Sequence, residues 1–128
     1  MKVVIAGSRG VTDYALVCEA VEESGFTITE VVSGTEPTGV DALGERWASD
    51  NGVPVKPFEP DWHRYTNKGA GWSNPAGKIR NREMAEYADA AVIIWDGSSP
   101  GTRDMIARMA AARKPCHVFI IGKPRIKF

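Results

Sequence analysis

Three short segments combine glycine, hydroxyl and charged side chains in a way that suits the binding of an anion. They are residues 7–10 (GSRG), 33–41 (SGTEPTGVD) and 96–102 (DGSSPGT). Glycines let backbone N–H groups approach a phosphate, and an arginine such as Arg9 can add a charge-assisted hydrogen bond. The residues that we expect to contact the anion are Gly7, Ser8, Arg9, Gly10, Gly34, Thr38, Gly39, Asp41, Gly97, Ser98, Ser99, Gly101 and Thr102.

Each of these segments also has a purely structural interpretation. Residues 7–10 could form a tight turn whose arginine points to water, with Thr12 as the N-cap of the helix that follows. Asp41 could favour the dipole of its own helix or cap it. Ser98 or Ser99 would be a good helix cap in any protein, because a proline follows at the first helical position. The sequence leaves both interpretations open.

A long polar connection over residues 59–76 carries aromatic and basic side chains. Such residues on a loop suit stacking on a base and contact with phosphate. They suit equally well a loop that folds onto its own hydrophobic cluster, to which Trp72 would contribute. The residues that we expect to form a lid over a ligand are Asp61, Trp62, Arg64 and Tyr65.

Arg80 lies in a predicted helix, one turn before Met84 and on the same inner face. An inward arginine needs an anionic partner, for which Glu83, Asp96 and a ligand are the candidates. Asp96, at the end of a predicted strand, is better placed for a ribose hydroxyl than for phosphate. We therefore expect Arg80 to share one anion with Arg9 and the turn at residues 97–102.

The elements that must position these residues follow from hydrophobic periodicity. Short apolar runs rich in β-branched residues predict strands at residues 2–6, 30–32, 53–58, 90–95 and 116–121. Helical patterns alternate with them. This alternation predicts an α/β fold, a Rossmann-like doubly wound three-layer sandwich with a five-stranded parallel sheet in the order 3-2-1-4-5. Ligands bind such sheets at the carboxyl ends of the strands, where the polar segments lie.

Length and composition indicate one ordinary globular domain over residues 1–128. Hydrophobic residues make up 43% of the chain and charged residues 25%, and no apolar run is long enough to span a membrane. The N-terminal sequence becomes polar after a few apolar residues, so we expect no signal peptide and a cytoplasmic location.

The charged residues and the cysteines exclude further classes of partner. Lys plus Arg (16) equals Asp plus Glu (16), so the chain lacks the positive field that nucleic-acid binders use. Cys18 and Cys116 have no second cysteine or histidine at metal-ligand spacing. We therefore expect structural thiols, no metal site, no membrane contact and no nucleic-acid partner.

Several motifs together resemble the SLOG superfamily, a Rossmann-like group that includes the Lonely Guy phosphoribohydrolases and the DNA-processing protein Smf/DprA. The motifs are VVIAGSRG, VVSG followed by GVDALGERWA, FEPDWHRY, IRNREMAEYADAAVIIWDG and PGTRDMI. The branch that they resemble most is the one related to YspA and YpsA. The resemblance implies a five-stranded parallel sheet and a nucleotide or nucleotide-derived ligand.

Lonely Guy enzymes hydrolyse the N-glycosidic bond of nucleoside monophosphates with an arginine and a glutamate. By resemblance the arginine is Arg80, but the glutamate position is Met105, which cannot act as an acid. Asp104 is one residue earlier and would point about 100° away around the helix. The segment SGTEPTGVD is also one residue longer than is usual in the branch and lacks its arginine.

Three functions compete. The first is the binding or sensing of a small nucleotide-derived ligand, such as a nucleoside phosphate or an ADP-ribose-like molecule, with no cofactor required. The second is an N-glycosidase that uses Arg80 with Asp104 or Asp96, or with Asp41 or Asp61, in place of the missing glutamate. The third is a DprA-like nucleic-acid accessory protein, which only the basic residues 122–128 support.

Members of the superfamily assemble through helices, so the resemblance also implies a homo-oligomer. Four residues offer more apolar surface than one face of the sheet needs. These residues are Met84, Tyr87, Met105 and Met109.

Overall fold

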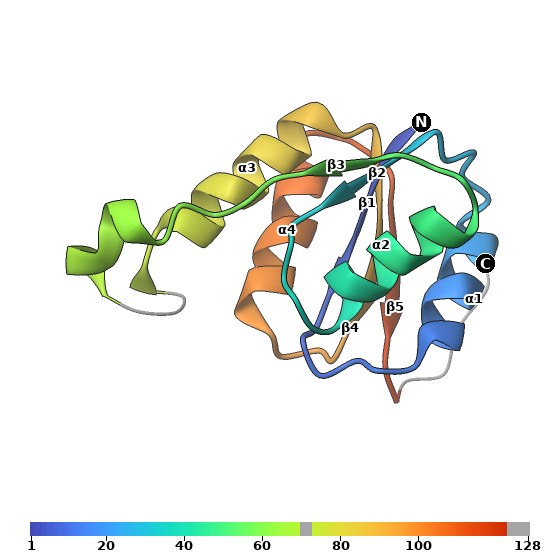
Figure 1. Cartoon of the computed structure of the whole chain (residues 1–128), viewed down its shortest axis with the longest axis horizontal. Coiled ribbons are helices and arrows are strands. Elements are labelled where there is room, and N and C mark those ends of the chain that lie inside the picture. Colours follow the sequence, from blue (N-terminus) through green and yellow to red (C-terminus); the bar gives the residue numbers. More distant parts are fainter. Residues whose placement is uncertain (70–72, 123–128) are drawn as a thin grey trace.

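Five parallel strands form one sheet in the computed structural model, which describes residues 1–69 and 73–122 (Figure 1). The strand order is β3-β2-β1-β4-β5, which confirms the predicted α/β fold and its strand order. The strands are β1 (Lys2–Gly7), β2 (Glu30–Ser33), β3 (Val55–Pro57), β4 (Ala90–Trp95) and β5 (Cys116–Ile120). The helices are α1 (Tyr14–Ser24), α2 (Val40–Asp50), α3 (Ala76–Tyr87) and α4 (Pro100–Ala111), with a 3-10 helix η1 (His63–Lys68).

The third strand is shorter than the predicted residues 53–58. It lies at the edge of the sheet and pairs with β2 from Val55 to Pro57. The N–H of Val53 instead donates to the carbonyl of Ala48 at the end of α2. Pro54 has no N–H to donate to a ladder, and it stands directly before the first residue of the strand.

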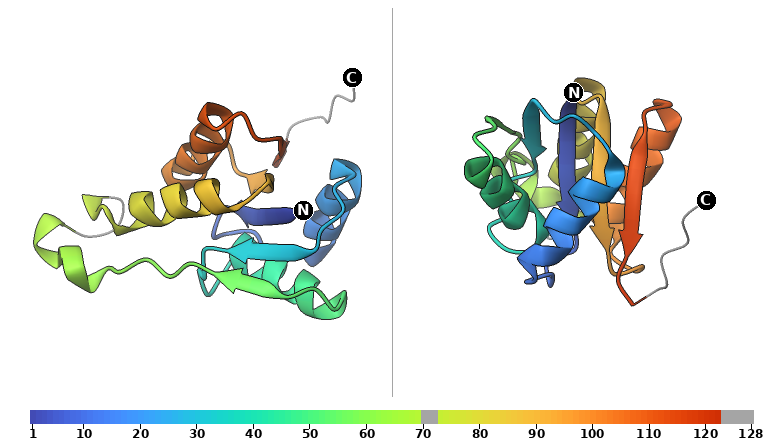
Figure 2. Two further views of the ribbon diagram at one scale, coloured as in Figure 1. Left: turned by 90° about the horizontal axis from the view of Figure 1, so that it is seen from above. Right: turned by 90° about the vertical axis from the view of Figure 1, so that its right-hand side faces the viewer.

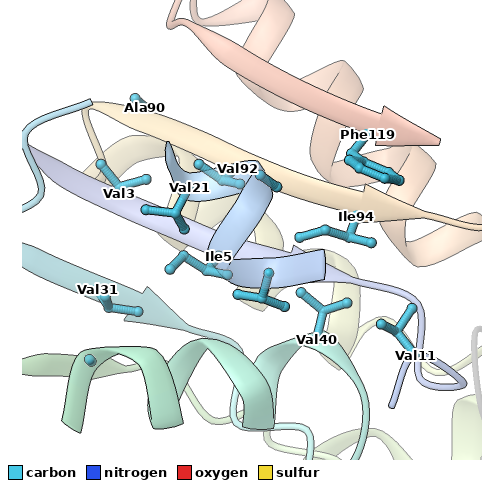
Figure 3. Close-up of a cluster of buried hydrophobic side chains, with 13 residues drawn as sticks. Val3, Ile5, Val11, Val21, Val31, Val40, Ala90, Val92, Ile94 and Phe119 are labelled. Atoms are coloured by element: carbon cyan, nitrogen blue, oxygen red, sulfur yellow. The ribbon is translucent and has the colours of Figure 1, made fainter. Parts of the chain in front are cut away.

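Helices cover both faces of the sheet (Figure 2). Alternate side chains of the strands belong to different buried clusters, one under each pair of helices. In β1, Val3 and Ile5 contact one buried cluster, whereas Val4 and Ala6 contact the other. The first cluster includes residues of α1 and α2 and is drawn in Figure 3. The second includes residues of α3 and α4. Strands that are covered on both faces have few polar side chains, as the sequence indicated.

The N-cap of α1 is Asp13 and not the predicted Thr12. The Asp13 side chain accepts a hydrogen bond from the N–H of Ala15 at 3.0 Å, and Thr12 is exposed. Both residue types are good caps, so the sequence did not distinguish them.

The methionines that were expected to provide an oligomer surface are buried within the chain. Met84, Met105 and Met109 have at most 2% of their surface exposed and belong to the second cluster. Tyr87 packs against Phe58. The three methionines fill the core between the sheet and its two helices and provide no surface for assembly, whereas Tyr87 is only partly buried. The homo-oligomer stays a prediction.

Within the described ranges 1–69 and 73–122, no helix is both long enough and apolar enough to cross a membrane.

Candidate functional site

A cavity of about 280 Å³ lies where β1 and β4 end side by side. Its walls come from the end of β1, the loops after β1 and β2, helix α3 and the first turn of α4. This is the carboxyl edge of the sheet, where the sequence predicted a ligand. The predicted site residues that line the cavity are Gly7, Arg9, Asp41, Trp62, Arg80, Ser99, Gly101 and Thr102.

Arg80 reaches the cavity from α3 and is held by two neutral oxygens. Its Nη1 donates to the carbonyl of Gly34, and its Nε donates to Oδ1 of Asn81 at 3.0 Å. Among the described residues no carboxylate lies within ion-pair distance of its guanidinium. Neither Glu83 nor Asp96 is therefore its partner, contrary to two of the sequence-based options. Burial lowers the pKa of Arg80, and the nearby charges of Asp41 and Glu36 oppose that shift.

Asp41 is a buried carboxyl group that lies beside Gly34, close to Arg80. A Cβ atom on Gly34 would lie 2.7 Å from both Asp41 Oδ2 and Arg80 Nη1, so both side chains close over this glycine. Burial raises the pKa of Asp41 to about 6, although the hydrogen bond from the N–H of Glu36 and the charge of Arg80 act against the rise. With this pKa, Asp41 is half protonated near pH 6 and mainly ionised at pH 7, with a minor protonated fraction.

Arg9 and Glu36 form an ion pair at the mouth of the cavity. Arg9 Nη2 lies 3.3 Å from Glu36 Oε2, and 69% of the Arg9 side chain is exposed. Exposed ion pairs contribute little to stability because water and salt screen them. The pair can therefore open, and Arg9 is able to turn to an incoming anion.

The first turn of α4 presents backbone donors to the cavity. Pro100 occupies the first helical position, as predicted, and Ser99 precedes it at the N-cap without a side-chain cap bond. Asp96 Oδ1 instead accepts the N–H groups of Ser98 and Ser99, both at 2.8 Å. Gly101 and Thr102 line the cavity, and the first N–H groups of a helix have no partner within it, so these two residues hold unpaired backbone donors beside the cavity.

The loop between β2 and α2 uses its donors within the chain. The N–H of Val40 donates to the carbonyl of Ser8, and that of Glu36 donates to Asp41 Oδ2 at 3.1 Å. Gly39 has φ 77° and ψ −151°, and a Cβ atom there would lie 2.5 Å from the Cα of Arg9. The small Gly39 therefore lets this loop approach the loop after β1 closely. Asp41 does not cap its helix, because α2 has no side-chain cap hydrogen bond.

A protein-family model, described as the YspA, cpYpsA-related SLOG family, matches residues 1–65. This match covers more than half of the chain. The chain belongs to the YspA, cpYpsA-related SLOG family. A comparison with curated proteins finds no match. The matched part of this SLOG chain contributes Arg9, Glu36, Asp41 and Trp62 to the cavity.

Several predicted site residues of the SLOG chain lie outside the cavity wall. Ser8 is buried, and its hydroxyl accepts the N–H of Asp96 at 3.0 Å. Asp104 pairs with Arg108 at 2.8 Å. Asp61 accepts the N–H of Arg64 at 3.3 Å. The other predicted residues that do not line the cavity are Gly10, Gly34, Thr38, Gly39, Arg64, Tyr65, Asp96, Gly97 and Ser98.

The connection that was expected to be a lid extends away from the sheet, with η1 at its far end (Figures 1 and 2). Of the four expected lid residues, Trp62 lines the cavity. Its carbonyl accepts the side-chain amide of Asn74 at 3.0 Å, which ties it to the start of α3. Trp72, which could have joined a cluster in this loop, lies outside the described residues.

The cavity of the SLOG chain also contains residues that sequence reasoning missed. On α3, Gly77, Asn81 and Met84 line the cavity together with Arg80. Their spacing of three and four residues is that of one helix face, so extending the periodicity from Arg80 would have found Gly77 and Asn81. No comparable signal pointed to Glu36, because its position depends on the fold of an irregular loop. Within the described residues, no group of three or more His, Cys, Asp or Glu side chains could hold a metal ion.

Proposed function

We propose that this SLOG chain binds a small nucleotide-derived molecule, such as a nucleoside phosphate or an ADP-ribose-like molecule, in the cavity at the carboxyl edge of the sheet. The proposal rests on the contacts of the Arg80 guanidinium. Its guanidinium lines the cavity and is oriented by neutral oxygens, with no carboxylate in ion-pair contact. A partly buried cation of this kind is stabilised when an anion enters.

A phosphate group fits the donors that surround this position. Arg80 supplies charge from α3, while Gly101 and Thr102 offer N–H groups at the positive end of the α4 dipole. Arg9 adds a second guanidinium once its ion pair with Glu36 opens. Two arginines and a helix N-terminus on one anion form a site that suits phosphate better than a single carboxylate.

The remainder of the cavity suits the nucleoside part of such a ligand. Trp62 offers apolar surface, and Asp41 offers a carboxyl oxygen to ribose hydroxyls. The volume of about 280 Å³ is close to the lower end of the range for small-molecule sites. We therefore expect a mononucleotide unit inside the cavity, with any further group of the ligand outside it.

The test is calorimetric titration with AMP, ADP-ribose and inorganic phosphate. Arg80→Ala should weaken the binding of phosphate-bearing ligands by about 1.5 to 3 kcal/mol, the range for a charge-assisted hydrogen bond. Arg82→Ala is the matched control, because Arg82 is an exposed arginine of the same helix that does not line the cavity. Equal affinity in the wild type and in Arg80→Ala would refute the proposed site.

An N-glycosidase activity is the second candidate, and the position of Asp41 favours it. Of the four carboxylates considered as substitutes for the missing glutamate, Asp41 lines the cavity, whereas Asp61, Asp96 and Asp104 do not. A partly protonated carboxyl group can act as a general acid. In that step Asp41 donates a proton to the leaving base as the C1′–N bond breaks. The oxygen of a water molecule bonds to C1′, and the proton that this water loses returns to the Asp41 carboxylate.

Chromatography separates the two candidates. The protein would be incubated with AMP and with NAD, and free base would be measured over time. Release of adenine or nicotinamide that is lost in Asp41→Asn supports the hydrolase. Binding of AMP without release of adenine supports a binding or sensing function.

A further inference from the structure

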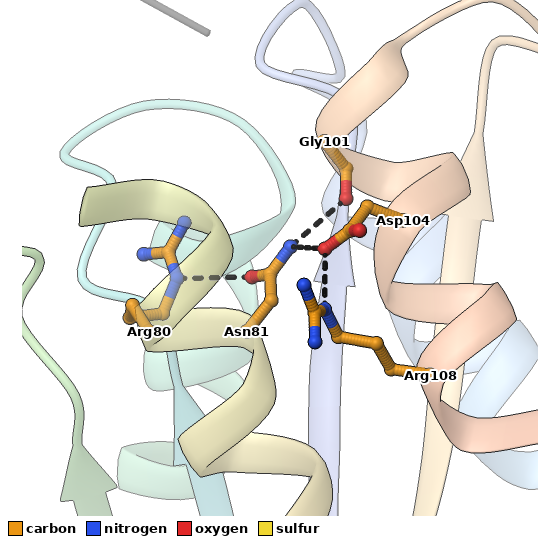
Figure 4. Close-up of polar contacts among 5 residues, drawn as sticks. All are labelled: Arg80, Asn81, Gly101, Asp104 and Arg108. Carbon is orange, nitrogen blue, oxygen red and sulfur yellow. Dashed lines mark hydrogen bonds and ion pairs between the residues drawn. The ribbon is translucent and has the colours of Figure 1, made fainter. Parts of the chain in front are cut away.

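Asn81 is a buried amide that connects the two helices of the proposed anion site. It is 3% exposed and has no charge of its own. Its Oδ1 accepts the Nε–H of Arg80 at 3.0 Å, and its Nδ2 donates to the carbonyl of Gly101 and to Asp104 Oδ2, both at 3.1 Å. Figure 4 shows the amide between Arg80 on α3 and the first turns of α4.

The partners of Asn81 allow only one orientation of its amide. A guanidinium only donates hydrogen bonds, whereas the carbonyl of Gly101 and the carboxylate of Asp104 only accept them. If the amide were rotated by 180°, its NH₂ group would face the guanidinium of Arg80 and its oxygen would face two oxygens. The contacts therefore fix the amide, which holds the Nε end of the Arg80 guanidinium while the carbonyl of Gly34 holds Nη1.

The same network keeps the charge of Arg80 available. Asp104 is paired with Arg108 Nε at 2.8 Å, so its carboxylate is compensated on α4 (Figure 4). Asn81 separates this ion pair from the guanidinium of Arg80. The arginine is thus oriented by a neutral oxygen and is not neutralised by the nearest acidic side chain of α4.

We propose that Asn81 is a positioning residue that holds the Arg80 guanidinium at a fixed distance and angle from the N-terminus of α4, and so determines how tightly the site binds a phosphate group. This inference rests on the proposed function. The two anion-binding elements come from different helices, and Asn81 bonds directly to both. A purely structural amide would stabilise the packing of α3 on α4 without any effect that depends on Arg80.

A double-mutant cycle tests this dependence. Asn81→Ala, Arg80→Ala and the double variant would be titrated with AMP and with inorganic phosphate. We expect Asn81→Ala to weaken binding about tenfold when Arg80 is present and less than about twofold when Arg80 is absent. Equal losses in the two backgrounds, or no loss in either, would overturn the proposal. If Asn81→Ala does not fold, Asn81→Ser takes its place, because its hydroxyl is too short to reach both helices.

Ile106→Ala is the control for general loosening of the helix layer. Ile106 packs against the second cluster from α4 and does not line the cavity. This variant should lower the melting temperature and keep the affinity for AMP. If it weakens binding as much as Asn81→Ala does, the effect of Asn81 is one of stability and the proposal is wrong.

A readout without ligand separates this inference from the proposed function. In an NMR spectrum of the ¹⁵N-arginine-labelled protein, the Arg80 Nε–H should exchange slowly with water, and Asn81→Ala should make that exchange fast. Unchanged exchange in the variant overturns the positioning role. If the wild type binds neither AMP nor phosphate but the exchange responds as expected, the proposed function fails and the positioning of Arg80 by Asn81 stands.

Discussion

The turns after β2 and β4 are built from the same kinds of residue but differ in what they offer to a ligand. Each connects the carboxyl end of a strand to the N-terminus of a helix through glycine and hydroxyl residues. After β2, the N–H of Val40 is bonded to the carbonyl of Ser8, and a buried acid, Asp41, follows. After β4, Gly101 and Thr102 of the first turn of α4 line the cavity.

The loop after β1 packs more closely against one of these turns than against the other. It lies directly against Gly39, and the carbonyl of Ser8 accepts the first N–H of α2. At the β4 turn, the Ser8 hydroxyl accepts the N–H of Asp96, and α4 begins with Pro100, which has no N–H to donate. The two helix starts therefore differ in how closely a second loop packs against them.

The largest expected effect is on the free energy of unfolding, and it appears when Gly39→Ala is compared with Gly97→Ala. Both glycines have a positive φ, one in each of these two turns. A Cβ atom on Gly39 would lie 2.5 Å from backbone atoms of Ser8 and Arg9, whereas the nearest atom at Gly97 is 3.8 Å away. Gly39→Ala should lower the free energy of unfolding by about 3 to 5 kcal/mol and Gly97→Ala by about 1 kcal/mol. Urea denaturation measures both, and equal losses would show that the turns do not differ in packing.

The next effect concerns the buried acid of the β2 turn. The pKa of Asp41 rises to about 6 from an ordinary value of 3.8, so the folded protein holds this proton more tightly than the unfolded chain does. The free energy of unfolding should therefore fall as the pH rises from about 4 to about 6. Asp41→Asn should remove that fall and be more stable than the wild type above pH 6, by about 2 to 3 kcal/mol.

Denaturant unfolding of both proteins at a series of pH values gives this difference directly. The variant and the wild type should converge below pH 4, where Asp41 is protonated in both states. A difference that does not change with pH would mean that the substitution acts through packing and that Asp41 is ionised throughout.

The smallest effect concerns the acid of the β4 turn. Asp96 accepts the N–H groups of Ser98 and Ser99, and these hydrogen bonds lower its pKa. Asp96→Ala should lower the melting temperature by a few degrees and should not weaken phosphate binding, because the donors of Gly101 and Thr102 remain. Asp13→Ala, which removes the N-cap of α1, is the matched control. Loss of phosphate affinity in Asp96→Ala alone would place Asp96 in the ligand site.

Residues on regular elements were predicted well, and the reason is their periodicity. The strand order, the inward position of Arg80 and the place of Pro100 follow from alternation, helical spacing and the requirements of a helix start. Each depends on rules that act within a few residues or on the handedness of strand crossovers. The prediction of Thr12 as the N-cap of α1 was wrong, because Thr12 and the adjacent Asp13 are both good cap residues.

By itself, the amino-acid sequence determined the sheet, its order and the edge at which polar residues collect. Only the tertiary structure decided which of those residues share a cavity, that Asp41 is buried beside Arg80, and that Asn81 connects Arg80 to α4. These outcomes depend on contacts between residues 20 to 46 positions apart in the chain. Local propensity contains no information on such contacts, because they form only when separate loops and helices pack together.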